Sequence, residues 1–572
     1  MADQSSVSTS GSSEDKLEAE ILRHALRVAA EEASIVVVKS AHSAMIVEGA
    51  DACAGILDRD ARLITLSTAT NLMHAASLRC SLPAIIEDHP IETMSPGDVF
   101  VMNDCFRGGI HSNDLLVFRP VFLEGEVAWF TGTLIHVADL GSSSAGGIVP
   151  SATDVYAEGL QLPPVRLYQA GEPVQDMHRL LALNSRTPDR VLGDVGALVA
   201  GVHVAAERMD GLAERFGAAR LRRGVDAYLQ GAERRLRDEL GELAPGVYRG
   251  EYQIDGDGID EERQPVVRVQ VEVRGKEGLL LDFSETDDQA VGAINAGFSQ
   301  ALTGAIYAVR CFVDPEIPMN EGCFAPVEVI FRKGSLLDPH APAACGGRVV
   351  SVTAVCEAVV QALSQAQPEK ATAASSVIHP FTLAAPSGID PWILLSYEYG
   401  GLGARRGSDG PSATGAFFLG GRNTVPQVEA LEATLPIRFE SVRLLPDSGG
   451  AGQWRGGLGV GTRIEVLADS ELALRSERVA LPPCGREGGA DGQAGDQFIE
   501  QVDGTRRELP AKGANLPLAA GERFVLTTSG GGGLGDPSAR TRDQLQKDVE
   551  EGFVTENAAS ALYGWDVREP SA

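Results

Sequence analysis

The alternation of hydrophobic and polar positions divides the chain into helical and β-rich stretches. Apolar residues recur at a period near 3.6 and predict helices over residues 15–34, 190–240 and 350–366. Apolar or alternating runs indicate strands at 266–273 and 279–283, and two short strands around a polar turn within 55–64. The chain is therefore predicted to be a mixed α/β (α+β) protein.

The strongest local pattern is a pair of apolar, β-rich runs, 115–122 and 127–135, separated by Leu-Glu-Gly-Glu. Such a pair predicts a β-hairpin that turns at this tetrapeptide. In a register that pairs Asp114 with His136, both side chains lie on one face of the hairpin. His111 then lies in the loop just beyond, so the spacing can bring the three side chains together.

His111, Asp114 and His136 form a candidate metal site. Imidazole nitrogens beside a carboxylate are typical ligands of a catalytic divalent ion with an open coordination position. A structural role is the alternative, because a histidine at a strand end usually hydrogen-bonds to a neighbour and acidic loop residues usually form turns. Other histidines have no comparable setting and are predicted to be structural or surface residues: His89, His178, His203, His340 and His379.

The length of 572 residues allows about three domains, each with its own core. A polar, Ser-rich stretch over 1–15 predicts a disordered tail rather than a signal peptide. An Ala-Pro-Gly turn near 244 and a rise in glycine content after about 385 indicate the other boundaries. The predicted domains are an N-terminal metal-binding domain, a central α+β domain and a Gly-rich, β-dominated C-terminal domain with a helix-like segment at 538–562: residues 16–243, 244–385 and 386–572.

Charge and motifs exclude several classes of protein. A net charge of −30 argues against nucleic acid and anionic membranes as partners, and no apolar run reaches the roughly 18 residues of a membrane span. Eight cysteines without a CxxC pair suit reduced thiols and a cytoplasmic location, and Cys105 is predicted to have a packing role. The glycine run at 530–537 lacks the nucleotide-binding G-x-x-x-x-G-K-[S/T] pattern, which favours a tight structural loop.

Motifs spread along residues 20–565 resemble those of the hydantoinase B/oxoprolinase family. These are the B-type metal subunits of ATP-dependent cyclic-amide hydrolases and related ketone carboxylases. The resemblance rests on many short motifs that occur in the right order: 41–43 with 48–53, 97–104, 111–114, 136–141, 156–160 with 163–165, 318–323, 447–457 and 535–537.

The resemblance implies a metal held by His111, Asp114 and His136, with Asp51 as a fourth ligand. It also implies Asp139 and Asp104 as candidate catalytic residues, each acting as a general base or as a partner that orients a ligand. Zn, Mn and Fe suit two histidines and two aspartates about equally. The bound ion would lower the pKa of a water molecule or polarise a substrate oxygen.

The resemblance further implies that ATP binds to a separate hydantoinase A-type subunit, in agreement with the absence of a nucleotide loop here. The expected function is hydrolysis of a small cyclic amide, such as a hydantoin, 5-oxoproline or another lactam, after phosphorylation on that partner. The alternative is a subunit of a ketone carboxylase. A non-catalytic scaffold and a stand-alone metallohydrolase are further possibilities from other classes.

The chain departs from the family pattern beside the proposed ligands. Cys105 stands where the family often has proline, Val137 where it often has a second histidine, and Ala52-Cys53 where it often has Phe-Ser. These changes leave the four proposed ligands in place. They alter the surroundings of the site, so the identity of the substrate stays open.

Overall fold

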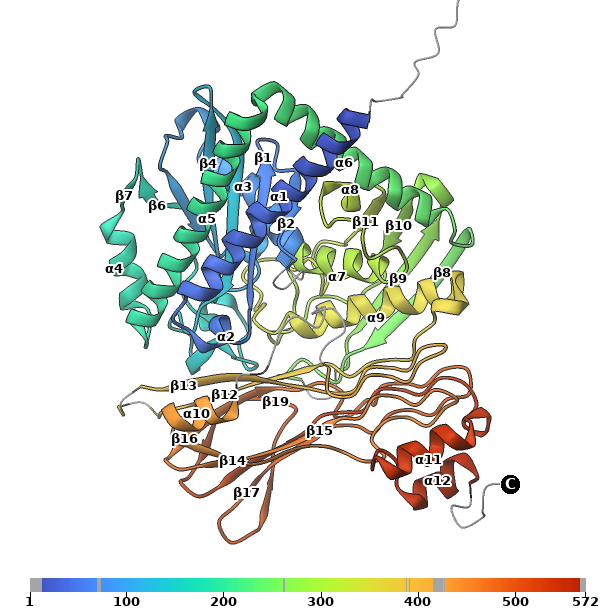
Figure 1. Ribbon diagram of the computed structural model, residues 1–572. Coiled ribbons are helices and arrows are strands. Elements are labelled where there is room, and N and C mark those ends of the chain that lie inside the picture. The colour runs from blue at the N-terminus through green and yellow to red at the C-terminus, as the bar shows by residue number, and fades with distance from the viewer. Residues whose placement is uncertain are drawn as a thin grey trace, which may run out of the picture.

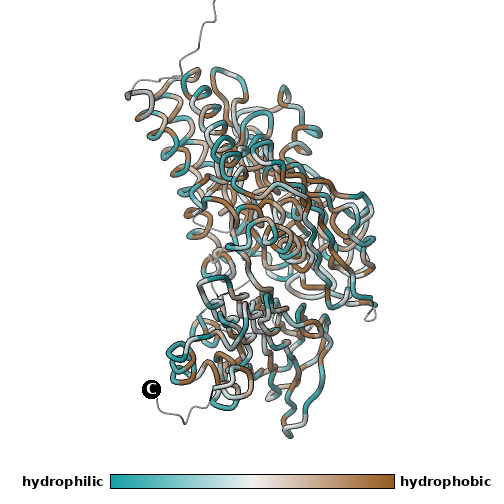
Figure 2. Tube along the Cα trace, turned by 90° about the vertical axis from the view of Figure 1, so that its right-hand side faces the viewer, coloured by the Kyte–Doolittle hydropathy of each residue, from teal (hydrophilic) through white to brown (hydrophobic). Residues whose placement is uncertain are grey.

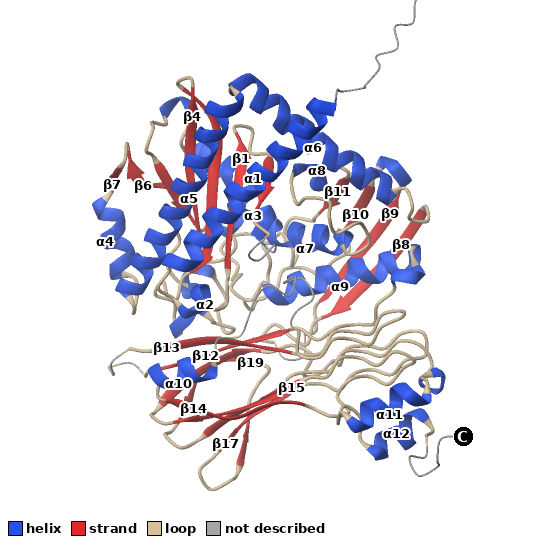
Figure 3. Ribbon diagram, in the orientation of Figure 1, coloured by secondary structure: helices blue, strands red, loops and turns tan. Residues whose placement is uncertain are grey.

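The computed structural model describes residues 13–68, 74–260, 263–386, 388–389, 391–414, 425 and 427–565. Two helix-covered sheets lie side by side in the upper part of Figure 1, and two further sheets form a β-rich layer below them. The view in Figure 2 shows the same two layers, with the C-terminal end on the lower one. Helices and strands are both abundant (Figure 3), which confirms the predicted mixed fold class.

The N-terminal sheet has seven strands in the order β2-β1-β5-β4-β3-β6-β7. Its neighbouring strands are all antiparallel. The strands are β1 (Ala52–Asp58), β2 (Leu63–Leu66), β3 (Val99–Met102), β4 (Asp114–Leu123), β5 (Glu126–His136), β6 (Val165–Gln169) and β7 (Glu172–Pro173).

Strands β4 and β5 form the predicted hairpin in the predicted register. Asp114 pairs with His136, and the pairing shifts by one position at a bulge after Val121. Glu124 and Gly125 close the turn with φ angles of 55° and 88°. Two consecutive positive φ angles are typical of the two-residue turns whose twist matches that of a hairpin. The hairpin thus carries Asp114 and His136 side by side to one end of the sheet.

Helices cover both faces of this sheet because alternate strand residues point to opposite sides. Apolar residues of α1 (Ser13–Ser40) and α5 (Pro188–Phe216) pack against one face, and α3 (Ala75–Asp88) packs against the other. Helix α1 is longer than predicted and includes the last residues of the expected N-terminal tail, whose residues 1–12 lie outside the described part. The short helices here are α2 (Ala44–Val47) and α4 (Gln175–Leu183).

Helix α6 (Ala218–Leu240) leads into the central sheet, whose strands follow the order β11-β10-β9-β8. Helix α9 packs on β8 and β9 and against α7. Among the described helices only α9 is long and apolar enough to cross a membrane, and 89% of it is buried inside the protein, as in a core helix. The bounds are β8 (Gly246–Gln253), β9 (Val266–Val273), β10 (Leu279–Asp282), α7 (Phe298–Arg310), α8 (Glu321–Phe324), β11 (Val327–Ile330) and α9 (Val349–Ala366).

The C-terminal layer contains two sheets with a shared apolar core between them. One has the order β13-β12-β16-β19 and the other β14-β15-β20-β17-β18. Their bounds are β12 (Ile378–Ala384), β13 (Ile393–Tyr399), β14 (Ile437–Leu444), β15 (Val460–Val466), β16 (Ser470–Arg475), β17 (Asp496–Glu500), β18 (Arg506–Glu508), β19 (Lys512–Leu518) and β20 (Arg523–Thr527). Helix α10 (Val428–Thr434) precedes β14.

The helix-like segment at the C-terminal end is two helices, α11 (Arg542–Glu550) and α12 (Glu556–Tyr563). The chain breaks between them at Gly552, which has a φ angle of 73°. Thr555 then starts α12 by accepting a hydrogen bond from the amide of Ala558. A left-handed residue followed by a capping threonine is the usual signal that ends one helix and begins the next.

Glycine-rich segments beside the C-terminal sheets pack as extended backbone outside the named strands. The amide of Gly531 donates to the carbonyl of Gly457 at 2.9 Å, and the amide of Gly457 donates to that of Leu402 at 2.8 Å. A Cβ atom on Gly531 would lie 2.0 Å from the Leu402 carbonyl oxygen, which leaves no room for any other residue. The run at 530–537 is therefore a structural element, as its sequence predicted.

Candidate metal centre

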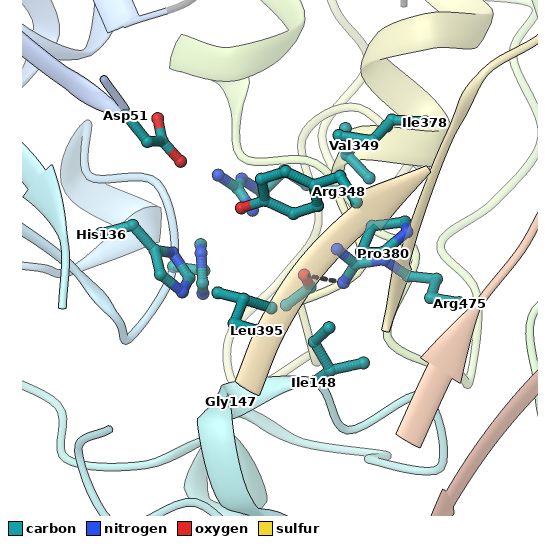
Figure 4. A pocket seen from close by; sticks show the side chains of 13 residues that line it. Asp51, His136, Gly147, Ile148, Arg348, Val349, Ile378, Pro380, Leu395 and Arg475 are labelled. Carbon is teal, nitrogen blue, oxygen red and sulfur yellow. Dashed lines mark hydrogen bonds between the residues drawn. The ribbon is translucent and has the colours of Figure 1, made fainter. Parts of the chain in front are cut away.

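The predicted ligands lie where the end of the β4–β5 hairpin meets the start of α9 and the C-terminal sheet. A small cavity of about 40 Å³ opens here. A water molecule needs roughly 10–15 Å³ of such space, so the cavity suits an ion and a compact group rather than a whole organic substrate. Figure 4 shows its lining, which includes Asp51, His111, His136, Arg348, Tyr397 and Arg475.

His111, Asp114 and His136 come together as the hairpin predicted. One donor atom from each lies within 4.8 Å of the others, and all three residues are buried. His111 Nε2 lies 3.0 Å from Asp114 Oδ2, and His136 Nδ1 lies 3.2 Å from Asp114 Oδ1. Ligands about 2.0–2.1 Å from a tetrahedral ion lie roughly 3.3 Å from one another, so the three donors suit a divalent ion.

An unpaired nitrogen atom supports a metal at this cluster. Within the described part of the chain, His136 Nε2 is buried without a hydrogen-bond partner, and the only contact of the buried His111 Nε2 is the one with Asp114 Oδ2. A buried polar atom without a partner costs free energy, and metal ligation is one way to satisfy it. The cluster therefore has donor atoms for a metal, and metal binding would satisfy its unpaired nitrogen.

The protonation states also suit a metal. Burial, together with the positive charge of Arg348, lowers the pKa of His111 to about 3, so its imidazole is neutral near pH 7. Burial opposes ionisation of Asp114, but the neighbouring His111 and Arg348 hold its pKa well below the usual range. A neutral imidazole and an ionised carboxylate are the forms that bind metal.

Asp51 lines the same cavity but lies outside the cluster of three. It is the residue before β1, and Figure 4 shows its carboxylate beside His136. Burial opposes its ionisation, and a contact of 3.1 Å between His74 Nε2 and Asp51 Oδ1 lowers its pKa overall. His74, which the sequence analysis did not identify, thus holds Asp51 in position. The role of Asp51 as fourth ligand stays a prediction.

Asp139 and Asp104 lie outside the cavity lining and have structural partners. Asp139 is fully buried and accepts from the amide and a guanidinium nitrogen of Arg186, both at 2.7 Å. Asp104 accepts from the amide of Phe106 at 2.9 Å and begins a short turn of helix at 105–107. Their catalytic roles stay predictions, for which this geometry supplies no direct contact with the cluster.

Three further residues at the cavity were missed by the sequence analysis. Arg348 donates from Nη2 to Asp114 Oδ2 at 2.8 Å, and Arg475 donates from Nη1 to the carbonyl oxygen of Gly346 (Figure 4). Burial raises the pKa of Tyr397 well above its usual value, so the phenol stays protonated. The only local signal is the position of Arg348 between a Gly-Gly pair and an apolar helix.

Glu158 lies just behind this lining. It accepts hydrogen bonds from the amides of Cys345 at 3.0 Å and Gly346 at 2.6 Å. Burial raises its pKa to about 7, so its charge changes near neutral pH. It thereby shapes the loop that carries Arg348.

The departures from the family pattern are packing positions. Cys105 is buried against Val155 and Cys345, which confirms its predicted packing role. Val137 and Ala52 belong to the core beneath α1 and α5, and Cys53 faces the opposite core.

The histidines expected to be structural fit that description. His89, His178 and His203 contact backbone carbonyl oxygens of Pro164, Val174 and Val199, and His340 is exposed. His379 is fully buried in β12, where neither ring nitrogen has a hydrogen-bond partner among the described residues, and it lies outside the cluster of three. None of the five lines the cavity at the cluster.

Comparison with known proteins identifies the family of this chain. Residues 15–537 match the family described as Hydantoinase B/oxoprolinase. A putative D-/L-hydantoinase subunit from a Pseudomonas species is 29% identical over 84% of this chain and 82% of its own length. The acetophenone carboxylase delta subunit of Aromatoleum aromaticum is 27% identical over 93% of this chain and 83% of its own.

A solved structure agrees. The crystal structure of ATP-dependent caprolactamase from Pseudomonas jessenii superimposes with a TM-score of 0.89 at 26% identity, covering 98% of both chains. The match to the family extends over nearly the whole chain, and the relatives are enzymes of more than one reaction class. This chain is a member of the hydantoinase B/oxoprolinase family.

Proposed function

We propose that this chain is the metal-binding catalytic subunit of an ATP-dependent enzyme that hydrolyses a cyclic amide. The observation that carries the proposal is the buried cluster of His111, Asp114 and His136 at a cavity, where His136 Nε2 has no hydrogen-bond partner among the described residues. A divalent Zn, Mn or Fe ion held there, with Asp51 as fourth ligand, would activate water or polarise a substrate oxygen.

The chain's own residues would position the reacting groups. Arg348 fixes the Asp114 carboxylate at 2.8 Å, and His74 fixes that of Asp51 at 3.1 Å. A second cavity of about 270 Å³ shares His136 and Leu395 with the first and has a largely apolar lining from β13 and α10. This space suits the carbon skeleton of a small substrate, beside the compact site for its reacting group.

A partner subunit completes the proposal. Relatives of this chain are named as subunits, and the solved structure is that of an ATP-dependent enzyme. We propose that an A-type subunit binds ATP and phosphorylates the substrate, which is then hydrolysed here. All eight cysteines are free thiols, in keeping with the cytoplasmic location proposed for the complex.

The second candidate is a subunit of a ketone carboxylase. It is favoured by the match to the acetophenone carboxylase delta subunit over 93% of this chain. Both reactions develop negative charge on an oxygen, and the same buried cluster with a metal would stabilise it. The two candidates differ in substrate rather than in what the site has to do.

The test is substrate-stimulated ATP turnover by this chain together with the subunit that co-purifies with it. Hydantoins, 5-oxoproline and other lactams form one panel, and ketones with bicarbonate form the other. Stimulation by the first panel supports the hydrolase and stimulation by the second supports the carboxylase. The His111→Ala complex serves as the inactive control. Failure of both panels with a metal-loaded complex contradicts both candidates, and hydrolysis by the isolated chain without ATP contradicts the two-subunit scheme.

A further inference from the structure

Two arginines form the wall of the small cavity that faces the metal cluster (Figure 4). Arg348 immediately precedes α9 and Arg475 ends β16, and they are 7% and 6% exposed. Within the described residues, the Nε atoms of both are buried without a hydrogen-bond partner. Each guanidinium has five N–H donors, so both retain donors for a ligand.

Among the buried arginines of the described residues, Arg475 differs in having neither an ion pair nor a stacked aromatic ring. Arg540 binds both carboxylate oxygens of Asp409 and also contacts Asp548. Arg478 stacks on the ring of Tyr252, with its guanidinium carbon 4.2 Å from the ring centroid. Across the described part of the chain Arg475 has no ion pair, and its one hydrogen bond goes to a neutral carbonyl oxygen. A buried cation without a counter-ion is costly unless a ligand supplies the negative charge.

The charges around the cavity do not balance once a metal is bound. A divalent ion, Arg348 and Arg475 would carry four positive charges. Asp51 and Asp114 carry two negative charges, and Glu158 adds up to one more. Burial and the neighbouring Arg348 lower the pKa of Arg475 to about 10, which still leaves it charged at neutral pH. The excess of one to two positive charges calls for an anionic ligand.

The N-terminus of α9 adds to this excess. Its first residue, Val349, lines the cavity, and the helix is 18 residues long. The dipole at such an end favours an anion nearby. A planar guanidinium pairs its parallel N–H groups with two oxygens of one phosphate or carboxylate group. The small volume and the size of the charge excess favour a phosphoryl group over a singly charged carboxylate.

We propose that Arg348 and Arg475 bind the phosphoryl group of the activated substrate, beside the metal cluster. This inference rests on the proposed function, because the phosphoryl group would come from ATP through the partner subunit. Arg475 is a specificity-determining residue in this scheme. Arg348 has a second task, since it also holds Asp114. The same contacts would bind free phosphate after the reaction.

Calorimetric titration with inorganic phosphate tests the proposal on the metal-loaded complex and on its metal-free form. Arg475→Gln is expected to weaken phosphate binding about 10- to 100-fold, as the loss of a charged hydrogen bond does. Arg475→Lys should give an intermediate loss, because lysine keeps the charge without the forked geometry. The matched control is Arg478→Gln, three residues along and equally buried, which should bind phosphate like the wild type.

Metal content and the thermal midpoint are measured on every variant. Unchanged phosphate affinity in a folded, metal-loaded Arg475→Gln protein would overturn the proposal, and so would binding of acetate as tight as that of phosphate. If Arg475→Gln does not fold, the Arg475→Lys titration decides the question by the same criterion. Tighter binding of an organic phosphate monoester than of inorganic phosphate would identify the substrate as the occupant, and the reverse order would identify the product.

The phosphate titration and the turnover assay can fail independently, so each tests its own proposal. The complex could bind phosphate through Arg475 and yet turn over neither the lactams nor the ketones. This result would support the phosphate site and reject the proposed reactions. If ATP-dependent turnover occurs but phosphate affinity is the same in the wild type and in Arg475→Gln, the proposed reaction is supported and the phosphate site is rejected.

Discussion

The two walls of the small cavity are built in different ways. The wall of metal ligands comes from residues 51–136, which belong to or border the single N-terminal sheet. The wall of arginines is assembled from the start of α9 and the end of β16, in the central and C-terminal parts of the chain. One wall supplies imidazoles and carboxylates, and the other supplies positive charge.

This difference separates two tasks. A metal needs several donors held within a fraction of an ångström, and a hairpin with a defined register provides that locally. Arg475 on the opposite wall can change with the packing of the C-terminal layer without moving the metal ligands, whereas Arg348 is tied to Asp114. We infer that metal binding and substrate recognition can be altered independently, which the following substitutions test.

The largest effect is expected from His111→Ala, which removes a donor of the metal wall. Loss of a residue that merely orients a ligand costs about 10- to 100-fold in metal affinity, so loss of a ligand should exceed this range. Elemental analysis of the purified protein is the measurement, and His178→Ala is the control, because His178 contacts a backbone carbonyl and the ring of Tyr168 and does not line the cavity. Equal, substoichiometric metal in the wild type and in His111→Ala would show that the site is wrongly assigned.

Asp139→Asn tests whether the buried aspartate behind the metal wall is structural. Asp139 accepts two hydrogen bonds of 2.7 Å from Arg186, and an amide can replace only one of these acceptors. The free energy of unfolding should fall by about 2 kcal/mol, as measured by urea denaturation. Asp176→Asn, at an exposed site that pairs with Arg179, should leave stability unchanged. Full stability with lost turnover would instead support the catalytic role.

Two buried histidines, His111 in the metal wall and His379 in β12, should make the protein less stable in acid. Burial lowers the pKa of each to about 3. Below an unfolded pKa near 6.5 the unfolded chain binds a proton that the native chain does not, so stability falls as pH decreases from 6.5 towards 3.

Replacing His379 by leucine removes its share of this loss. Relative to the wild type, the variant should lose about 1.3 kcal/mol less stability between pH 7 and 5.5. The measurement is urea unfolding at both pH values, and His203→Leu, at a half-buried surface site, is the control. An identical pH dependence in wild type and His379→Leu would mean that His379 is protonated in the native state.

The hairpin was predictable from sequence because its information is local. Two apolar, β-rich runs and a two-residue turn between them specify the hairpin, and its register puts Asp114 opposite His136. The arginine wall depends on contacts between distant segments: Arg348 lies 234 positions from Asp114, and Arg475 lies 129 positions from Gly346. No local pattern specifies such tertiary contacts, so these residues became visible only in the folded chain.

The smallest effect on stability is expected at Asp104, and it decides between two roles. Asp104 caps the turn at 105–107 through the amide of Phe106, and asparagine caps about as well as aspartate. Asp104→Asn should therefore change the free energy of unfolding by only a few tenths of a kcal/mol and leave turnover intact. Asp104→Ala, which removes the cap, should cost about 1 kcal/mol. If Asp104 is a general base instead, Asp104→Asn should lower kcat by about 100-fold or more, because an amide cannot accept the proton. Steady-state kinetics of the two variants, beside their urea midpoints, therefore separate a structural aspartate from a catalytic one at the edge of the metal wall.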